Sequence, residues 1–194
     1  LLWRDSTVDG IKSGHTSEAG YCLASSALRG DQRLIAVVMG APSEKQRADD
    51  NQELLNYGFR FFESHRLYAA GKALANPELW KGATPTLPLG VANDVVVTMP
   101  RGRYGDLKAT LDIPARLVAP FQKGQKVGSL KVALDGKTLV EEPLVALADG
   151  PEGGFFKRLS DGAWMWFKGD AGPATSTAIE SADQKPGEPK QGTP

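Results

Sequence analysis

Lys12, Ser13, Gly14 and His15 stand in a row near the amino end of the sequence and offer three groups that bind anions. An ammonium stabilises negative charge, a hydroxyl reads a carboxylate, and a backbone N–H at the end of a strand can donate to an oxyanion. A glycine among them lets the backbone approach a ligand closely. The four residues are therefore a candidate site for binding and stabilising an anionic group.

Other chemistries have weaker support. His15 could act as a general base through its ring, but the ring can also point away while its backbone N–H works, and we favour the backbone. Cys22 stands among small residues, with no local base to activate it, and is expected to be a buried small hydrophobe. The two histidines and the one cysteine lie far apart, so we expect no metal and no other cofactor.

The composition of the chain argues against nucleic acid as a binding partner. The 194 residues carry 23 Lys and Arg against 23 Asp and Glu, so a net charge of zero gives no bulk attraction to nucleic acid. The length suits one or two modest domains. No apolar run approaches the roughly 18 residues of a spanning helix. Because Leu1 replaces the usual Met and Leu1-Leu2-Trp3 is typical of a folded domain, we expect the C-terminal portion of a longer protein.

The elements that would position the four residues form a first predicted unit. Residues 10–16 are typical of the start of a strand, 20–27 of a second strand, and 33–39 of a third that forms a hairpin with the second. Ser43 can cap a helix, and Gln46 completes a capping box. One face of that helix, expected to pack on the sheet, carries residues at helical spacing: Ala48, Asn51, Leu55, Phe59 and Phe62.

Residues 67–150 have a different pattern. Short apolar segments separated by turn residues predict strands at 95–98, 107–113, 116–119, 127–134 and 138–147. Asp135-Gly136 between the last two is a strong hairpin signal. Many short strands of this kind predict a small β-sandwich. Arg101 and Arg103 flank a glycine and are expected to be solvated loop charges.

The carboxyl-terminal part begins with a linker rich in glycine. A stripe at helical spacing follows it: Phe155, Phe156, Leu159, Ala163, Trp166 and Phe167. Such a helix can fold onto its own domain or lie in a membrane surface, and we favour the membrane. Residues 169–194 cannot bury enough apolar area to order themselves, which predicts a disordered tail.

Several segments, taken in order, resemble one family. Lys12-Ser13-Gly14 matches the K-[ST]-G box of penicillin-recognising serine enzymes and stands in D-G-I-K-S-G-H-T-S-E-A-G-Y-C-L-A-S-S-A. Further on, R-G-R-Y-G-D-L-K-A and L-D-G-K-T-L-V-E-E-P-L-V-A-L continue the likeness. The chain resembles the low-molecular-mass penicillin-binding proteins, more narrowly the D-alanyl-D-alanine carboxypeptidases of the penicillin-binding protein 5 and 6 type. The partner boxes S-x-x-K and S-x-N do not occur in the sequence.

The resemblance implies a role for each residue of the box. Lys12 would lie beside the nucleophilic serine and supply positive potential and a hydrogen bond. Ser13 stands where the family usually has threonine, and its hydroxyl would bind the terminal carboxylate of the substrate. Gly14 would let the strand approach that ligand. The backbone N–H of His15 would be one of two oxyanion-hole donors; the other belongs to the serine that this sequence does not contain.

The fold that the resemblance implies is multidomain α+β. Residues 1–66 would be the C-terminal part of an incomplete penicillin-binding, serine β-lactamase-like α/β catalytic domain, and residues 67–150 a small all-β sandwich. Residues 151–168 would form an amphipathic helix on the membrane surface, contacting it through Phe155, Phe156, Leu159, Trp166 and Phe167. Residues 169–194 would be the disordered tail.

The function implied is that of a serine-type D-Ala-D-Ala carboxypeptidase. The intact enzyme would be acylated by a peptidoglycan stem peptide ending in D-Ala-D-Ala, release D-alanine and hydrolyse the acyl-enzyme, and β-lactams would act as suicide mimics. It would lie peripherally on the periplasmic face of the bacterial inner membrane. This chain alone is expected to be inactive. Two alternatives stay open: a serine β-lactamase, and a non-catalytic membrane-associated β-sandwich in which the box is accidental.

Overall fold

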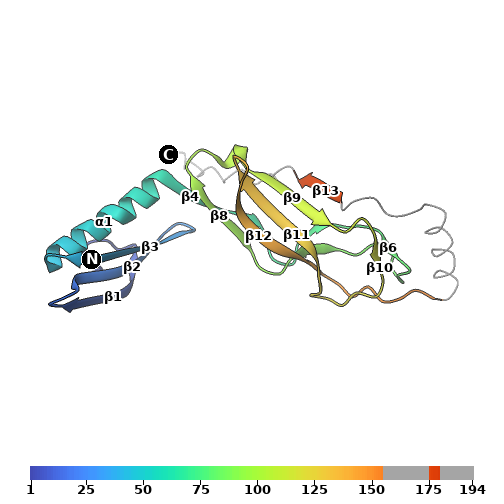
Figure 1. Ribbon diagram of the computed structural model, residues 1–194, viewed down its shortest axis with the longest axis horizontal. Coiled ribbons are helices and arrows are strands. Elements are labelled where there is room, and N and C mark those ends of the chain that lie inside the picture. The colour runs from blue at the N-terminus through green and yellow to red at the C-terminus, as the bar shows by residue number, and fades with distance from the viewer. Residues whose placement is uncertain (155–174, 180–194) are drawn as a thin grey trace, which may run out of the picture. The chain divides into compact units, whose positions relative to one another are not determined.

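The computed structural model of the chain describes residues 1–154 and 175–179, which form mostly β-strands with one long helix (Figure 1). They fall into two compact units. Unit 1 comprises residues 1–65 and 97–104, and unit 2 comprises residues 66–96 and the described residues from 105 onward. The predicted fold is multidomain α+β, and the described residues are mostly β-sheet with one helix.

Unit 1 is built on a three-stranded antiparallel sheet, in the order β1 (Val8–Thr16), β2 (Gly20–Arg29) and β3 (Gln32–Ala41). In the first turn, the Thr16 hydroxyl accepts a hydrogen bond from the Ala19 N–H at 2.9 Å. The predicted hairpin is confirmed, and the strand predicted from residue 10 begins two residues earlier. Because β2 is central, β1 lies at an edge of this sheet.

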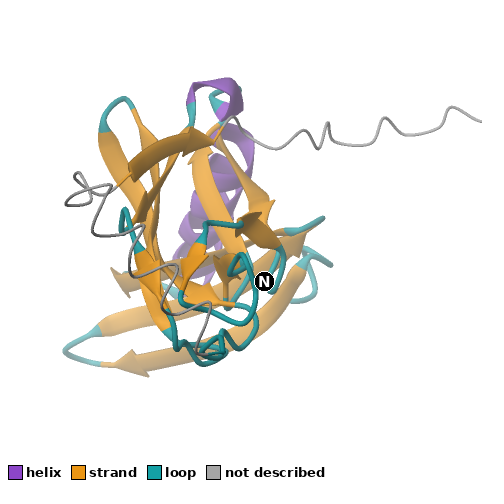
Figure 2. Cartoon of the chain, turned by 90° about the vertical axis from the view of Figure 1, so that its right-hand side faces the viewer, coloured by secondary structure: helices purple, strands orange, loops and turns teal. Residues whose placement is uncertain are grey.

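Helix α1 (Glu44–Phe61) covers one face of the sheet and is the single long helix in Figure 2. Ser43 caps it by accepting a hydrogen bond from the Gln46 N–H at 3.1 Å. The Gln46 side chain donates to Asp50 and does not close the predicted capping box. The core between helix and sheet consists of small and apolar side chains: Val8, Ala27, Ala36, Leu55 and Phe59.

Asn51, on the stripe predicted to face the sheet, is fully buried and ties α1 to two strands. Its Nδ2 donates to the carbonyls of Leu23 and Ala36, both at 3.2 Å, and its Oδ1 accepts from the Ser25 hydroxyl. A buried amide without partners costs about 1–3 kcal/mol. These bonds therefore satisfy Asn51 only when the helix sits at one register on the sheet.

The end of α1 differs from the prediction. Phe62 does not continue the helical stripe; it is the C-cap, with extended backbone, and begins β4 (Phe62–Tyr68). Arg101 is exposed in a turn, as predicted, but its guanidinium also donates to the carbonyls of Phe59 at 2.9 Å, Arg60 at 3.3 Å and Phe62 at 3.2 Å. A helix leaves its last carbonyls without partners. Arg101 supplies those partners from a distant part of the chain.

Unit 2 is built around a six-stranded sheet in the order β13-β9-β11-β12-β7-β5. In that order its strands are Thr175–Ile179, Lys108–Ile113, Lys126–Leu134, Lys137–Ala146, Leu89–Val91 and Ala73–Ala75. A shorter parallel pair joins β6 (Leu79–Trp80) to β10 (Leu117–Val118), and β4 pairs with β8 (Val95–Pro100). A 3-10 turn, η1, spans Tyr104–Asp106.

Two glycines, Gly136 in a turn and Gly128 within a strand, allow the central strands of this sheet to pair. Asp135 and Gly136 join β11 to β12 with φ angles of 51° and 78°, which two-residue hairpin turns require, so the predicted hairpin is confirmed. Gly128 of β11 lies where a Cβ would come within 2.2 Å of the Asp112 carbonyl oxygen on β9. Only glycine allows that approach. The buried side chains around these strands are aliphatic: Leu79, Leu87, Leu89, Val91, Leu111, Leu130, Val132 and Leu144.

The longer predicted strands of unit 2 occur within a few residues of their expected bounds, whereas β5, β6 and β7 were not predicted. These strands are two or three residues long, too short to show a period of two. Thr175–Ile179 forms β13, in antiparallel pairing with β9, inside the segment predicted to be disordered. The predicted membrane helix does not begin at residue 151, because Glu152 forms an antiparallel β-bridge with Gly82. From residue 155 onward the predicted helix lies outside the described residues.

No helix within residues 1–154 and 175–179 combines the length and apolar character needed to cross a membrane.

Candidate active site

The four candidate residues lie on the exposed edge strand β1. Ser13 pairs with Leu23 of β2, Gly14 with Cys22 and His15 with Tyr21. Residues 11–16 are all exposed, and no strand of the described residues pairs with the other side of β1. A ligand can therefore approach this edge, as the sequence motif requires.

The hydrogen bond between Lys12 Nζ and the Ser13 carbonyl, at 3.1 Å, indicates which backbone groups face that edge. The pairing of β1 with β2 places that carbonyl on the side away from β2, because the Leu28 N–H donates to the Thr7 carbonyl at 2.9 Å and alternate residues of β2, including Cys22 opposite Gly14, therefore face β1. In an antiparallel ladder, alternate residues direct both N–H and C=O to the partner strand, and the residues between them direct both away. His15 is two residues from Ser13, so its N–H faces the same free edge.

The side chains of Lys12 and Ser13 leave β1 on opposite faces. Ser13 shares a face with its partner Leu23, whereas Lys12 shares the other face with Ala24. The bond to the Ser13 carbonyl brings the Lys12 ammonium back over the strand. The ammonium, the hydroxyl and the His15 N–H can therefore meet one ligand only along the free edge.

Lys12 and Ser13 also line a hollow of about 770 Å³. The rest of its lining comes from residues 1–4, from Val8, Gly10 and Ile11 of β1, from Leu23 and Ser25 of β2, and from four of the first five residues of α1. Gly14 and His15 do not belong to this lining. The structure thus brings two of the four predicted residues to the hollow and leaves the other two farther along the strand.

The side chain of His15 packs on a neighbouring aromatic residue. Its ring centroid is 4.0 Å from that of Tyr21, its partner on β2, with an angle of 32° between the planes. A ring packed in this way can hold the backbone of His15 in place. That arrangement agrees with a role for the backbone N–H, which faces the free edge.

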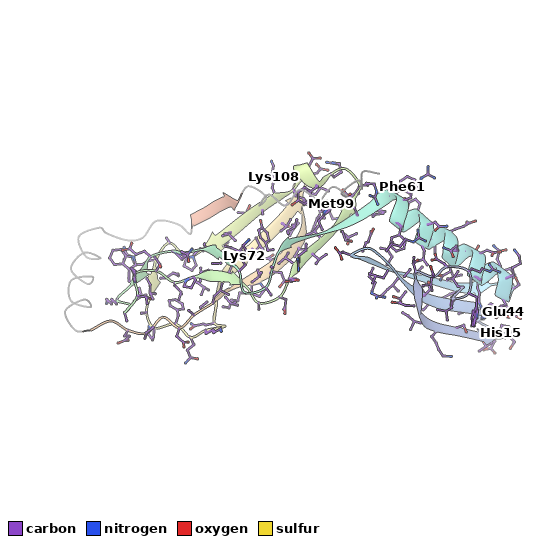
Figure 3. The ribbon with its side chains drawn as sticks, turned by 180° about the vertical axis from the view of Figure 1, so that it is seen from behind. His15, Glu44, Phe61, Lys72, Met99 and Lys108 are labelled. Carbon is purple, nitrogen blue, oxygen red and sulfur yellow. The ribbon has the colours of Figure 1, made fainter. Side chains whose placement is uncertain are left out.

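Arg47 is a residue of this site that the sequence reasoning missed. It lies in the first turns of α1, and its Nη1 donates to the Gly14 carbonyl at 3.3 Å. Its Nη2 donates to Glu44 at 2.6 Å, and its guanidinium lies 5.5 Å from the Tyr21 ring centroid. Figure 3 shows His15 and Glu44 at the same end of unit 1. The only signal in the sequence is the spacing of Glu44 and Arg47, three residues apart just after a helix cap.

Two carboxylates fix the segment that leads into β1. Asp5 accepts hydrogen bonds from the Thr7 hydroxyl at 2.6 Å, from Gln52 at 2.9 Å and from Arg29 at 2.9 Å, and the first two hold the pKa of Asp5 well below its usual range. Arg33 binds both oxygens of Asp9 and lowers its pKa in the same way. Both carboxylates stay ionised at neutral pH and anchor the start of the strand.

Within residues 1–154 and 175–179, no three His, Cys, Asp or Glu side chains gather as metal ligands would. Cys22 is half-buried on β2, not buried as predicted, and its Sγ lies 3.6 Å from the Ala19 carbonyl oxygen. The groups that remain are an ammonium, a hydroxyl and backbone N–H donors, which bind an anion.

Two known families match the chain in sequence order. Residues 1–43 match the family described as D-alanyl-D-alanine carboxypeptidase, and residues 62–152 match penicillin-binding protein 5, C-terminal domain. This chain is homologous to the C-terminal region of penicillin-binding protein 5-type proteins. Among these relatives, the D-alanyl-D-alanine carboxypeptidase DacA of Escherichia coli (strain K12) is 47% identical over 163 residues, which are 83% of this chain and 40% of DacA.

Two further relatives agree. The carboxypeptidase DacC of Escherichia coli (strain K12) is 41% identical over 170 residues, which are 86% of this chain and 42% of DacC. The crystal structure of penicillin-binding protein 5 from Haemophilus influenzae superposes with a TM-score of 0.73 at 39% identity, covering 78% of this chain and 45% of that one. The chain thus spans about 40% of the length of the curated relatives that it matches.

Proposed function

We propose that this chain forms one wall of the active site of a serine-type D-Ala-D-Ala carboxypeptidase that trims peptidoglycan stem peptides. The observation that carries the proposal is the exposed edge of β1, where Lys12, Ser13 and the His15 N–H can reach one ligand. The curated relatives described above are named as D-alanyl-D-alanine carboxypeptidases, which supports the same reaction.

Each group of the edge has a part in that reaction. The Ser13 hydroxyl donates to the terminal carboxylate of the substrate, and Lys12 adds the positive potential that favours this anion. As the nucleophilic serine attacks the carbonyl carbon, negative charge develops on the carbonyl oxygen, and the His15 N–H donates to it. The acyl-enzyme forms as D-alanine leaves, and water then hydrolyses it.

The same edge accounts for penicillin binding. A β-lactam carries a carboxylate and a reactive carbonyl, so it can use the Ser13 hydroxyl and the His15 N–H as the substrate does. The carbonyl acylates the serine, and the product hydrolyses slowly. No cofactor takes part in this scheme, because the nucleophile and the donors supply all of the chemistry.

The proposal assigns a part to each region of the chain. Residues 1–66 belong to the α/β penicillin-binding domain, and residues 67–150 form a sandwich that holds the active site away from the membrane. Residues 155–168 form an amphipathic helix at the periplasmic face of the inner membrane, supported by the apolar spacing of Phe155, Phe156, Leu159, Trp166 and Phe167.

Release of D-alanine tests the proposal. The product of the complete reading frame that encodes this chain is incubated with a peptide ending in D-Ala-D-Ala, and the 194-residue chain is incubated in parallel. We expect release, and covalent labelling by a fluorescent penicillin, only from the complete product, because S-x-x-K does not occur in this chain. A complete product that neither releases D-alanine nor takes up the label would favour the non-catalytic module. Rapid hydrolysis of penicillin without release of D-alanine would favour a β-lactamase.

A further inference from the structure

We propose that Arg47 is a positioning residue for the oxyanion donor of this site. Its guanidinium binds the carbonyl of Gly14, and the same peptide unit carries the N–H of His15. This inference rests on the proposed function, since it concerns the donor that the reaction would use. Arg47 touches no reacting atom in this scheme and acts through the backbone.

The planarity of the peptide unit makes the connection direct. The Gly14 carbonyl and the His15 N–H lie in one plane and, in a trans peptide, point in opposite directions. A hydrogen bond at 3.3 Å from Arg47 Nη1 restrains the oxygen. Rotation of the unit that would turn the His15 N–H away from the free edge would also break that bond. Gly14 directs its carbonyl toward its partner Cys22 on β2, and Arg47 adds a second restraint on the same oxygen from α1.

Arg47 is itself held in place. Its side chain is only 13% exposed, and Glu44 accepts from Nη2 at 2.6 Å. Ser43 caps the helix just before Glu44, which fixes the turn that carries both residues. The guanidinium also lies over Tyr21, whose ring packs on that of His15. Arg47 thus restrains the Gly14–His15 peptide unit in two ways: it binds the Gly14 carbonyl, and it contacts Tyr21, which packs on the His15 side chain.

A positive charge on the Gly14 carbonyl has a second effect. Hydrogen bonds in a chain polarise one another, so a donor on the carbonyl strengthens the N–H of the same amide as a donor. The strengthening matters most when the acceptor becomes an oxyanion, because charge-assisted hydrogen bonds are the stronger ones. Loss of Arg47 should therefore slow acylation more than it weakens substrate binding.

Kinetics of the complete reading-frame product give the first test. Arg47→Gln removes the charge, Arg47→Lys keeps it without the guanidinium geometry, and Arg60→Gln is the charge control in the last turn of α1, outside the lining of the hollow. We expect kcat for D-alanine release to fall about tenfold or more in R47Q with KM within about twofold, a smaller fall in R47K, and no change in R60Q. One lost oxyanion donor costs about 10²–10³ in kcat, and a misaimed donor retains part of that effect. Equal kcat in R47Q and wild type, with both proteins folded, would overturn the inference.

The His15 amide gives a test that needs no activity. In the ¹⁵N-labelled 194-residue chain, R47Q should shift the His15 amide resonance and speed its hydrogen exchange, whereas R60Q should leave both unchanged. R47K should lie between them, and it serves as the second variant if R47Q fails to fold. An unchanged His15 amide in both Arg47 variants would overturn the inference. An inactive wild-type product beside an altered amide would instead count against the proposed function.

Discussion

At Gly14 the backbone conformation does not require glycine, and the space beside the residue is open. It does not have a positive φ, and a Cβ built on it would meet no atom of the described chain within 4 Å. Alanine therefore fits the strand. Glycine is needed at this position only if a ligand occupies the space that a Cβ would fill.

We predict that Gly14→Ala leaves the fold intact and impairs the reaction. Alanine is favoured over glycine in a strand by about 0.5–1 kcal/mol, so the free energy of unfolding should not fall. Acylation by a labelled penicillin should slow at least about tenfold in the complete product, which corresponds to about 1.4 kcal/mol, because the methyl group meets the ligand.

Gly30→Ala is the matched control for that substitution. Gly30 has a φ of 59°, and a Cβ there also meets no atom within 4 Å. The left-handed conformation costs a non-glycine residue about 1–2 kcal/mol, so this variant should lose stability and keep its rate of acylation. Unimpaired acylation of G14A would show that no ligand passes Gly14.

Asp5 predicts how the stability of unit 1 depends on pH. Its pKa is lowered in the fold by the bonds from Thr7 and Gln52, whereas the unfolded chain has a value near about 3.9. Above that pH both states are ionised and the full contribution is present; as pH falls below about 4, the unfolded chain takes up the proton first and stability is lost. Asp5→Asn should cost about 1 kcal/mol at pH 7.

Urea unfolding at several pH values measures this effect. The difference in free energy of unfolding between wild type and D5N should shrink as pH is lowered from 6 to 3. Glu18 is an exposed carboxylate in the β1–β2 turn, and Glu18→Gln is the control. This variant should have the same free energy of unfolding as wild type at each pH. A difference that stays constant over this range would show that Asp5 does not titrate as its hydrogen bonds indicate.

At the scale of the elements, Arg101 joins the end of α1 to the segment that follows β8. It donates to three carbonyls at the helix end, and a cation there is also favoured by the helix dipole. We predict that Arg101→Gln lowers the free energy of unfolding of unit 1 by about 1–2 kcal/mol. Lys45→Gln, which removes a charge at the other end of α1, should change it by less than about 0.5 kcal/mol. Equal losses in the two variants would show that Arg101 contributes only net charge.

The sequence predicts the local elements well because their signals are local. Ser43 before an apolar stripe predicts α1, and Asp135-Gly136 predicts the β11–β12 hairpin. The sequence does not predict that Arg101 donates hydrogen bonds to the carbonyls at the end of α1, or that Arg47 donates one to the Gly14 carbonyl. Both depend on contacts between segments far apart in the chain, and no spacing rule covers them.

The site was predicted in part for the same reason. The K-[ST]-G tripeptide identifies Lys12, Ser13 and Gly14 as candidates, but only the register of β1 shows which backbone groups face the free edge. Arg47 enters through the packing of α1 on the sheet, which Asn51 fixes. The motif therefore predicts which groups of the site bind the ligand, whereas the residues that position those groups are found only in the tertiary structure.

At the scale of the whole molecule, the apolar stripe at residues 155–167 predicts how the protein meets a membrane. Each large apolar side chain gains roughly 1.5–3 kcal/mol on full burial, whereas a lysine or arginine near an anionic surface adds about 1 kcal/mol. Apolar burial should therefore dominate. We predict that detergent releases the chain from anionic vesicles and that 1 M salt does so poorly.

Paired variants separate the two forces. Trp166→Ser with Phe167→Ser should abolish flotation with vesicles, whereas Lys157→Gln with Arg158→Gln should weaken it only modestly. Release by salt alone, or full flotation of the W166S/F167S variant, would contradict a membrane-surface helix.

The most direct test of the account is the acylation of the complete product by penicillin when Lys12 is changed. Lys12→Gln keeps the length and polarity of the side chain and removes the ammonium at the β1 edge, while Arg60→Gln removes a positive charge from the far end of α1. We predict that the second-order rate constant falls at least about 100-fold in K12Q, or about 2.7 kcal/mol, and less than about twofold in R60Q. Equal rate constants for K12Q and a reactive wild type would contradict the claim that this edge forms the active-site wall.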